Sequence, residues 1–271
     1  MNAPAATKPV SAWIGEFILL SALWGASFLF LRIAAVALAL LLAAGAVFWL
    51  TLPSVAGLEK ETPRETAMMR FRAEQARQQG RKARRSWRRV PLSRMAPHLI
   101  QAVLIAEDDK FYAHEGFDWE SMRRALEDNV RKGRVLRGGS TITQQLAKNL
   151  FLDPQQSVFR KLREAAIAWK LERALSKRRI LDLYLNLIEW GDGVYGAEAA
   201  ARAWFALPAA ELSLAQAIRL ASILPNPHRF SALDESSSRL NRKRRLIAQR
   251  MLRRHWISQE AYDQALAEMG L

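Results

Sequence analysis

The sequence predicts a mainly α-helical domain preceded by an N-terminal transmembrane anchor. Three observations support this prediction. The chain is almost continuously apolar from Phe17 to Leu52, apolar residues recur every three or four positions after Trp87, and no alternating pattern is long enough for a useful β-strand. No internal repeat is present. A chain of 271 residues has room for an anchor and one domain with a sizeable core.

The apolar segment has two parts, which meet at Arg32. Ile33 to Leu52 has about the twenty residues needed to cross a bilayer, whereas Phe17 to Leu31 is short for a second crossing. The segment lacks the polar stripe of a core helix and is too long for a cleaved signal peptide. We therefore predict an anchor over residues 17–52 after a tail of residues 1–16. One long tilted helix and a helical hairpin both fit the pattern.

The charge of the chain narrows the choice of partners. There are 41 Lys and Arg against 26 Asp and Glu, which leaves a formal net charge of +15. Nucleic acid, anionic lipid and a phosphorylated substrate all fit such an excess. The chain has no cysteine and no helix-turn-helix or RNA-binding signature, so we predict no nucleic-acid partner. The basic residues crowd between Arg70 and Arg94, shortly after the apolar segment, which favours anionic membrane lipids.

The same basic cluster bears on orientation. A simple positive-inside count would place the following domain in the cytoplasm, but the rule weakens with distance from the span. Residues 53–86 are predicted as a basic linker that contains a charged helix over Glu65–Arg89. The basic face of this helix fits a lipid surface, and a solvated stalk fits the same pattern.

After Trp87 the helical period continues to the end of the chain. We predict one domain over 87–256, followed by a helical tail over 257–271. The predicted helices are Met95–Ala106, Trp119–Val130, Thr141–Phe151, Val158–Leu175, Ile180–Ile188, Ala197–Phe205, Leu212–Leu224, Leu240–Trp256 and Ala261–Met269.

Three consecutive acids, Glu107 to Asp109, follow the first of these helices. Carboxylates at the end of an apolar segment are partly withdrawn from water, which suits proton transfer, so Glu107 is a candidate base. Acids are also common at helix ends, and spacing alone leaves both interpretations open. His114 in the same block fits a catalytic role or a structural one that fixes the loop, with Phe111 packed beneath and Gly116 at the turn.

A glycine turn at Gly138-Gly139 opens the second block. Glycine lets the backbone approach a ligand, and the free N–H groups at a helix start favour an anion. Ser140 alone is explained as a helix N-cap, but this does not account for the polar residues that follow it at helical spacing. The candidate sugar- and phosphate-binding residues are Ser140, Thr141, Gln144, Gln145 and Lys148, with Asn149 beside them.

The third block contains Arg160, Lys161 and Glu164. Arg160 and Glu164 are one helical turn apart, as in an ordinary surface ion pair. In the fourth block a helix with Tyr184 and Asn186 ends in the glycine-rich turn that follows Trp190. We expect these two side chains to shape a groove.

Ala221–Pro227 forms a fifth block. Taken in order from about Trp87 to about Trp256, the five blocks resemble those of the monofunctional biosynthetic peptidoglycan transglycosylases. Members of this family polymerise lipid II and share their domain with class A penicillin-binding proteins. The resemblance implies a lysozyme-like helical fold. It assigns the base to Glu107, with Asp108 as a support, and the second essential acid to Glu164. Arg160, Lys161 and Lys148 would then neutralise the departing pyrophosphate.

The resemblance also implies the reaction. A glycan is transferred from its lipid pyrophosphate to the 4-hydroxyl of the next lipid II, with inversion and release of undecaprenyl pyrophosphate. No cofactor is required, although a divalent cation (Mg²⁺ or Mn²⁺) fits the pyrophosphate. The implied location is the inner membrane, with a single-pass anchor and the catalytic domain in the periplasm. No penicillin-binding motif set follows, so cross-linking is left to a partner transpeptidase or to divisome or elongation proteins.

Two alternatives remain at this point. A lysozyme-like hydrolase or lytic transglycosylase also uses a glutamate in a helical groove, but its leaving group is a sugar and needs no cations. A basic membrane-anchored scaffold would explain the anchor and the charge, but not the ordered polar blocks.

Overall fold

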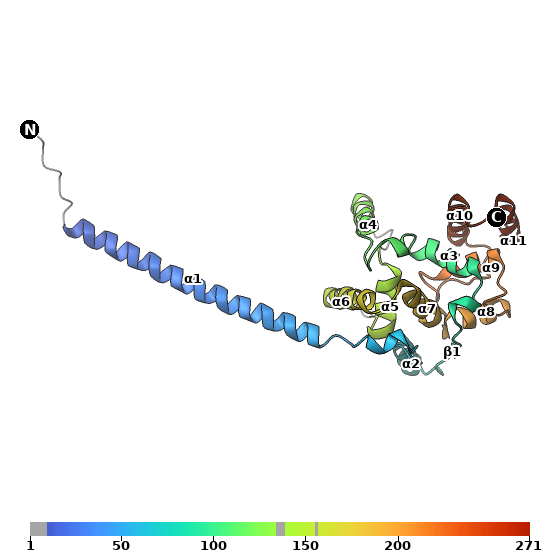
Figure 1. Ribbon diagram of the computed structural model, residues 1–271, viewed down its shortest axis with the longest axis horizontal. Helices are drawn as coiled ribbons and strands as arrows, with labels where there is room; N and C mark the ends of the chain where they lie inside the picture. The colour runs from blue at the N-terminus through green and yellow to red at the C-terminus, as the bar shows by residue number, and fades with distance from the viewer. Residues whose placement is uncertain (1–9, 134–138, 155–156) are drawn as a thin grey trace, which may run out of the picture. The chain divides into compact units, whose positions relative to one another are not determined.

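The computed structural model describes residues 10–133, 139–154 and 157–271, which belong to two compact units, Met1–Leu52 and Pro53–Leu271 (Figure 1). The mainly α-helical prediction is confirmed. In the described part of the chain, helices account for most of the structure, and the strands form one sheet of three short segments.

The first unit is a single helix. Helix α1 runs without interruption from Val10 to Leu50 and passes through Arg32, so the structure has the single helix and not the hairpin (Figure 1). It also begins inside the predicted tail, whose residues 1–9 lie outside the described part. At about 1.5 Å per residue, its 41 residues span roughly 60 Å, about twice the hydrocarbon thickness of a bilayer. The helix is long and apolar enough to cross a membrane.

The stretch predicted as a linker belongs to the second unit. It contains η1 (Ala56–Glu59) and α2 (Ala67–Gln78), which packs against α5 and buries Met68 and Met69. The expected helix over 65–89 is therefore shorter than predicted. It ends before Gly80, whose φ of +66° is left-handed, and the chain then becomes extended so that β1 can join the sheet.

Helices α3, α9, α10 and α11 form one half of the second unit. Helix α3 (Pro97–Glu107) packs against α9 (Leu214–Ile223) and α10 (Ser238–Arg253). Helix α11 (Gln259–Met269), which was predicted as a separate tail, packs against α9 and α10 and is continuous with the same core. Burial of α3 along most of its length fixes the position of its last residue, which begins the acidic block.

The other half is built around α5 (Ile142–Phe151), which packs against α6 (Val158–Ala174) and α7 (Lys177–Leu187). Between α3 and α5 lie η3 (Phe111–Ala113) and α4 (Trp119–Arg131). The short η2 (Leu92–Arg94) precedes α3. The polar blocks of the sequence therefore lie on α3, α5, α6 and α7, and the packing of these helices holds the blocks in place.

The sheet has the order β1-β3-β2 and adjoins α8 (Ala197–Phe205). β1 (Ser86–Trp87) is parallel to β3 (Val194–Tyr195), and β2 (Glu189–Gly191) is antiparallel to β3. Gly196 leads from β3 into α8 with a φ of +82°. A Cβ atom at this position would lie 2.6 Å from the carbonyl oxygen of Asn186, so only glycine fits the turn.

Asn186, predicted to shape the groove, is fully buried and joins α7 to the chain before α3. Its Nδ2 donates to the carbonyl oxygens of Val90 (2.9 Å) and Asp182 (2.8 Å), and its Oδ1 accepts from the N–H of Val90 (2.9 Å). One side chain therefore pairs both backbone groups of Val90.

We expect Asn186→Ala to destabilise the fold by about 2 kcal/mol, because it leaves polar backbone groups of Val90 without partners. For a unit of this size, that corresponds to a fall in melting temperature of roughly 4–8 °C. The measurement is thermal unfolding of the detergent-solubilised chain followed by circular dichroism. Gln249→Ala, which removes an exposed amide on α10, is the control and should leave the melting temperature unchanged.

Candidate active site

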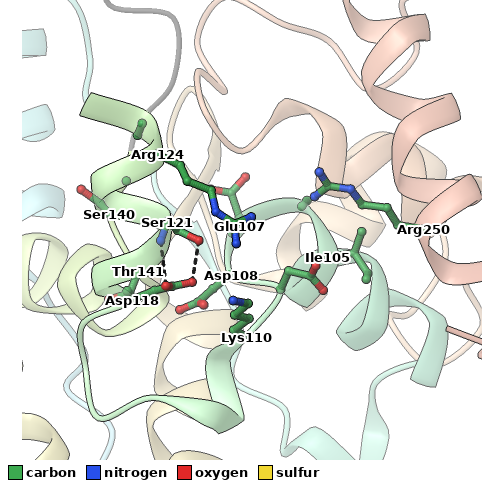
Figure 2. A pocket seen from close by; sticks show the side chains of 14 residues that line it. Ile105, Glu107, Asp108, Lys110, Asp118, Ser121, Arg124, Ser140, Thr141 and Arg250 are labelled. Atoms are coloured by element: carbon green, nitrogen blue, oxygen red, sulfur yellow. Dashed lines mark hydrogen bonds between the residues drawn. The ribbon is translucent and has the colours of Figure 1, made fainter. Parts of the chain in front are cut away.

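A pocket of about 230 Å³ opens where the end of α3 meets α4, the turn before α5, and α10. Figure 2 shows Glu107 in this pocket, with Ser140 and Arg124 on one side and Arg250 on the other. The pocket therefore contains the first acid of the block predicted to carry the chemistry.

Glu107 is the last residue of α3, and its carboxylate is held from two directions. Oε2 accepts a hydrogen bond from Gln145 Nε2 at 3.0 Å, and Oε1 lies 3.2 Å from Lys243 Nζ. Gln145 is fixed in turn by Tyr184, whose hydroxyl donates to Gln145 Oε1 at 2.9 Å. Complete burial raises the pKa of Tyr184, and the negative charges of Glu107 and Asp108 add to that shift, so the hydroxyl stays a donor.

Asp108 joins the first two polar blocks. Its Oδ2 accepts the backbone N–H of Ile142 at 3.0 Å, and its Oδ1 lies 2.9 Å from His114 Nε2. Asp108 therefore binds the N-terminus of α5, where negative charge is favourable. This geometry gives His114 a structural position, in edge contact with the buried ring of Phe111.

The residue that caps the start of α5 is not the one suggested by the sequence. The N-cap of α5 is Thr141 and not Ser140, and Thr141 forms a capping box with Gln144. Both side chains are buried, and Thr141 also donates to the carbonyl oxygen of Gly116, which has a φ of +86°. The side chain of Gln144 is therefore used to cap the N-terminus of α5. Gly138 lies outside the described residues.

Ser140 contacts a cation from the third block. Lys161 donates to Ser140 Oγ at 3.1 Å and also forms an ion pair with Glu164. Arg160 donates to the other carboxylate oxygen of Glu164 at 2.8 Å. Glu164 is buried with both cations on it, so the three side chains form a fixed cluster instead of an exposed surface pair.

Lys148 extends from α5 toward the same cluster. Burial lowers its pKa, the neighbouring cations Arg160 and Lys161 lower it further, and the nearby carboxylates of Glu164 and Glu107 oppose the shift. A second pocket of about 170 Å³ adjoins this residue and is lined by polar side chains. They include Gln145, Lys148, Asn149, Tyr184, Glu189 and His228. Asn149 is turned back onto its own helix and donates to the carbonyl oxygen of Gln145 at 2.8 Å.

The side chains around Glu164 do not fit a divalent cation at this carboxylate. Both carboxylate oxygens of Glu164 already contact cations. Among the described residues, no group of three or more His, Asp and Glu side chains is placed to hold a metal ion.

Comparison with known proteins gives the family. A family model described as "Transglycosylase" matches residues 73–252. The chain belongs to the transglycosylase family. A "Biosynthetic peptidoglycan transglycosylase" of Azoarcus sp. (strain BH72) is 52% identical over 178 residues, which cover 65% of this chain and 76% of the relative.

Two further proteins with the same name support this assignment. The relative from Aromatoleum aromaticum is 50% identical over 192 residues, covering 70% of this chain and 82% of that protein. The relative from Methylobacillus flagellatus is 46% identical over 214 residues, covering 79% and 93%. The resemblance seen in the motifs is thus confirmed, and so are the lysozyme-like helical fold and the prediction of a glycosyltransferase.

In this transglycosylase, α10 and its C-cap residue supply site residues that the sequence did not identify. Lys243 contacts Glu107, Arg250 lines the pocket, and Arg254 forms an ion pair with Asp109. Asp109 is therefore only partly exposed. The spacing of these basic residues is helical, but α10 carries so many Arg and Lys that the sequence alone gives no way to choose among them.

Proposed function

We propose that the chain polymerises lipid II into linear glycan strands and releases undecaprenyl pyrophosphate. The observation that carries this proposal is a fixed carboxylate beside a fixed cation cluster: Glu107 between Gln145 and Lys243, and Arg160 and Lys161 on Glu164. A base and a site for an anionic leaving group are the two elements that glycosyl transfer from a lipid pyrophosphate requires.

In the proposed reaction Glu107 accepts the proton of the 4-hydroxyl on the incoming lipid II sugar. The resulting oxygen nucleophile forms a bond to the anomeric carbon of the donor as the bond to pyrophosphate breaks on the opposite face, so the configuration inverts. Lys148, Arg160 and Lys161 stabilise the negative charge of the leaving group through charge-assisted hydrogen bonds. Tyr184 acts through Gln145, which sets the direction of the Glu107 carboxylate.

A lipid-linked substrate and an N-terminal anchor both indicate that the catalytic unit acts at a membrane surface. Helices α4 and α6 expose large apolar side chains that would meet the polyprenyl chain or the bilayer. They are Trp119, Leu126 and Val130 on α4, and Val158, Phe159 and Leu162 on α6. We propose that the chain is anchored in the inner membrane with its catalytic unit in the periplasm, where anionic lipids and a separate transpeptidase are its partners.

A hydrolase is the second candidate from the sequence, and the cation cluster argues against it. A hydrolase that cleaves between sugars produces no anionic leaving group. Holding Lys148, Arg160 and Lys161 close together costs electrostatic repulsion, which a pyrophosphate ligand would relieve.

The direct test is gel analysis of products from the purified full chain and labelled lipid II in detergent. A ladder of glycan strands with loss of label from the lipid fraction is expected. Wild-type chain that folds but yields only the starting material would refute the proposed polymerisation. Cleavage of isolated cell-wall glycan by the same preparation would then favour the hydrolase.

The pH dependence provides a second test. Because the pKa of Lys148 lies below its ordinary value, this side chain loses its proton at a lower pH than a solvated lysine. If the ammonium form binds the leaving group, kcat/KM for lipid II falls as the pH rises through that pKa. In Lys148→Arg the charge persists, so the alkaline limb should move to higher pH. An alkaline limb that is identical in both proteins would remove Lys148 from this role.

A further inference from the structure

A basic pocket of about 570 Å³ lies between the end of α2 and the turn that joins β2 to β3. The proposed reaction uses none of its side chains. A pocket with an excess of positive charge is a site for an anionic ligand. Its lining contains four cations and one acid, which are Arg72, Arg81, Lys82, Arg84 and Asp192.

Two of the four cations have no counter-ion. Arg72 and Arg81 each lie within ion-pair distance of a carboxylate, at 3.1 Å and 3.8 Å. In the described ranges, Lys82 and Arg84 form no ion pair and no side-chain hydrogen bond. Both residues are exposed. An incoming anion therefore meets two cations without having to displace a partner from either.

The segment that carries these two cations is fixed at both ends. At its start, the N–H of Arg81 donates to the carbonyl oxygen of Ala76 in α2 at 2.8 Å. At its end, the N–H of Ser86 donates to the carbonyl oxygen of Gly193 at 2.7 Å. Gly193 has a φ of +72°, and a Cβ atom there would lie 2.6 Å from the carbonyl oxygen of Arg84. Only glycine allows this close approach, which holds the segment against the β2–β3 turn.

The basic pocket adjoins the donor side of the proposed active site. Arg72 lines it and also lines the pocket of about 170 Å³ that contains Lys148. The guanidinium of Arg72 is fixed in this place by its Nε, which donates to Oε2 of the buried Glu189 at 3.1 Å. The two pockets therefore share one wall, and a flexible group on a ligand in the first can extend into the second.

Lipid II carries a group with the charge and the reach that this pocket requires. A stem peptide with free carboxylates is attached to its disaccharide, and a peptide of about five residues extends at most about 17 Å. A lipid headgroup is also anionic, but the exposed apolar side chains that would meet a membrane lie on α4 and α6, and neither helix lines the basic pocket. The stem peptide is therefore the better match.

We propose that Lys82 and Arg84 bind the stem-peptide carboxylates of the donor strand while Lys148 and its neighbouring cations bind the pyrophosphate. This inference rests on the proposed polymerisation, in which the donor presents both groups on one molecule. Binding at a second point makes the second contact intramolecular and slows release of the strand between transfers. The basic pocket therefore favours repeated additions to the same strand.

The test uses a labelled lipid-linked tetrasaccharide donor, blocked at its terminal 4-hydroxyl so that it cannot act as acceptor, with unlabelled lipid II as acceptor. The donor is prepared with free stem-peptide carboxylates and with the same carboxylates amidated. Lys82→Gln combined with Arg84→Gln should lower kcat/KM for the carboxylate donor about three- to thirtyfold and leave the amidated donor unaffected. Lys82→Arg combined with Arg84→Lys keeps both charges and should retain most of the activity. Arg88→Gln removes an exposed charge outside the pocket and should match wild type.

Coupling by wild type is established first, because its absence would defeat the proposed polymerisation and not this inference alone. With coupling present, a Lys82→Gln, Arg84→Gln double variant that uses the carboxylate donor like wild type overturns the inference. An equal loss with both donors also overturns it, because the loss would not depend on the carboxylates. A loss that appears only in vesicles containing phosphatidylglycerol, and not in detergent micelles, overturns it in favour of a lipid headgroup.

The amidated donor is informative even where wild type does not use it. The double variant compared with Arg88→Gln on the carboxylate donor then decides, and thermal unfolding confirms that both proteins are folded. Equal rates for these two proteins would overturn the inference, whereas a lower rate for the double variant is the expected result.

Discussion

Glu107→Gln is expected to lower the rate of glycan polymerisation by about 10²- to 10⁴-fold, the range that a positioned general base contributes. Glutamine has the size of glutamate and can still accept the hydrogen bond from Gln145, but it cannot take up the acceptor proton. The position of the side chain at the end of α3 is determined by burial of that helix, so the fold should be retained.

The measurement compares the initial rates of lipid II consumption and the product ladders of Glu107→Gln and wild type at equal concentrations. Glu260→Gln, an exposed acid in the first turn of α11, is the matched control and should leave the rate unchanged. Binding of lipid II should persist in Glu107→Gln, because Lys148, Arg160 and Lys161 are intact. Glycan of normal yield from Glu107→Gln would show that another group removes the proton.

The fold was largely predictable because its helices have regular apolar periods. The predicted Trp119–Val130 and Val158–Leu175 differ from α4 and α6 by a single residue at the C-terminal end. The error over Glu65–Arg89 has a local cause, because charge density alone indicated a helix there. The left-handed Gly80 and the pairing of β1 with β3 end the helix early, and the strand pairing involves residues more than a hundred positions later in the sequence.

The site was less predictable, for reasons that differ from residue to residue. The spacing of Thr141 and Gln144 is that of a capping box, so the sequence contained the signal that these side chains serve the helix start. No such signal exists for Lys243, which meets Glu107 across 136 residues of sequence. Only the packing of α10 on α3 brings that pair together.

Glu164→Gln tests how the leaving group is stabilised. Within the described residues, Glu164 forms its ion pairs with Arg160 and Lys161, so we treat it as a positioning residue for these two cations. Without its charge, the two cations should still attract pyrophosphate, but they are no longer fixed where charge develops in the transition state. We therefore expect kcat to fall about 10²- to 10³-fold, as for the loss of one preorganised donor, with KM for lipid II unchanged or lower.

A double-mutant cycle separates this role from direct catalysis. If Glu164 acts through the cations, Glu164→Gln should have little further effect in a chain that already carries Arg160→Met and Lys161→Met. If the effects multiply, Glu164 contributes independently of the cations and touches the substrate itself. A rise in KM with kcat unchanged would contradict positioning in another way, because it would mean that Glu164 supports ground-state binding. Glu164→Asp keeps the charge but shortens the reach to Arg160 and Lys161, so its kcat should lie between those of Glu164→Gln and wild type.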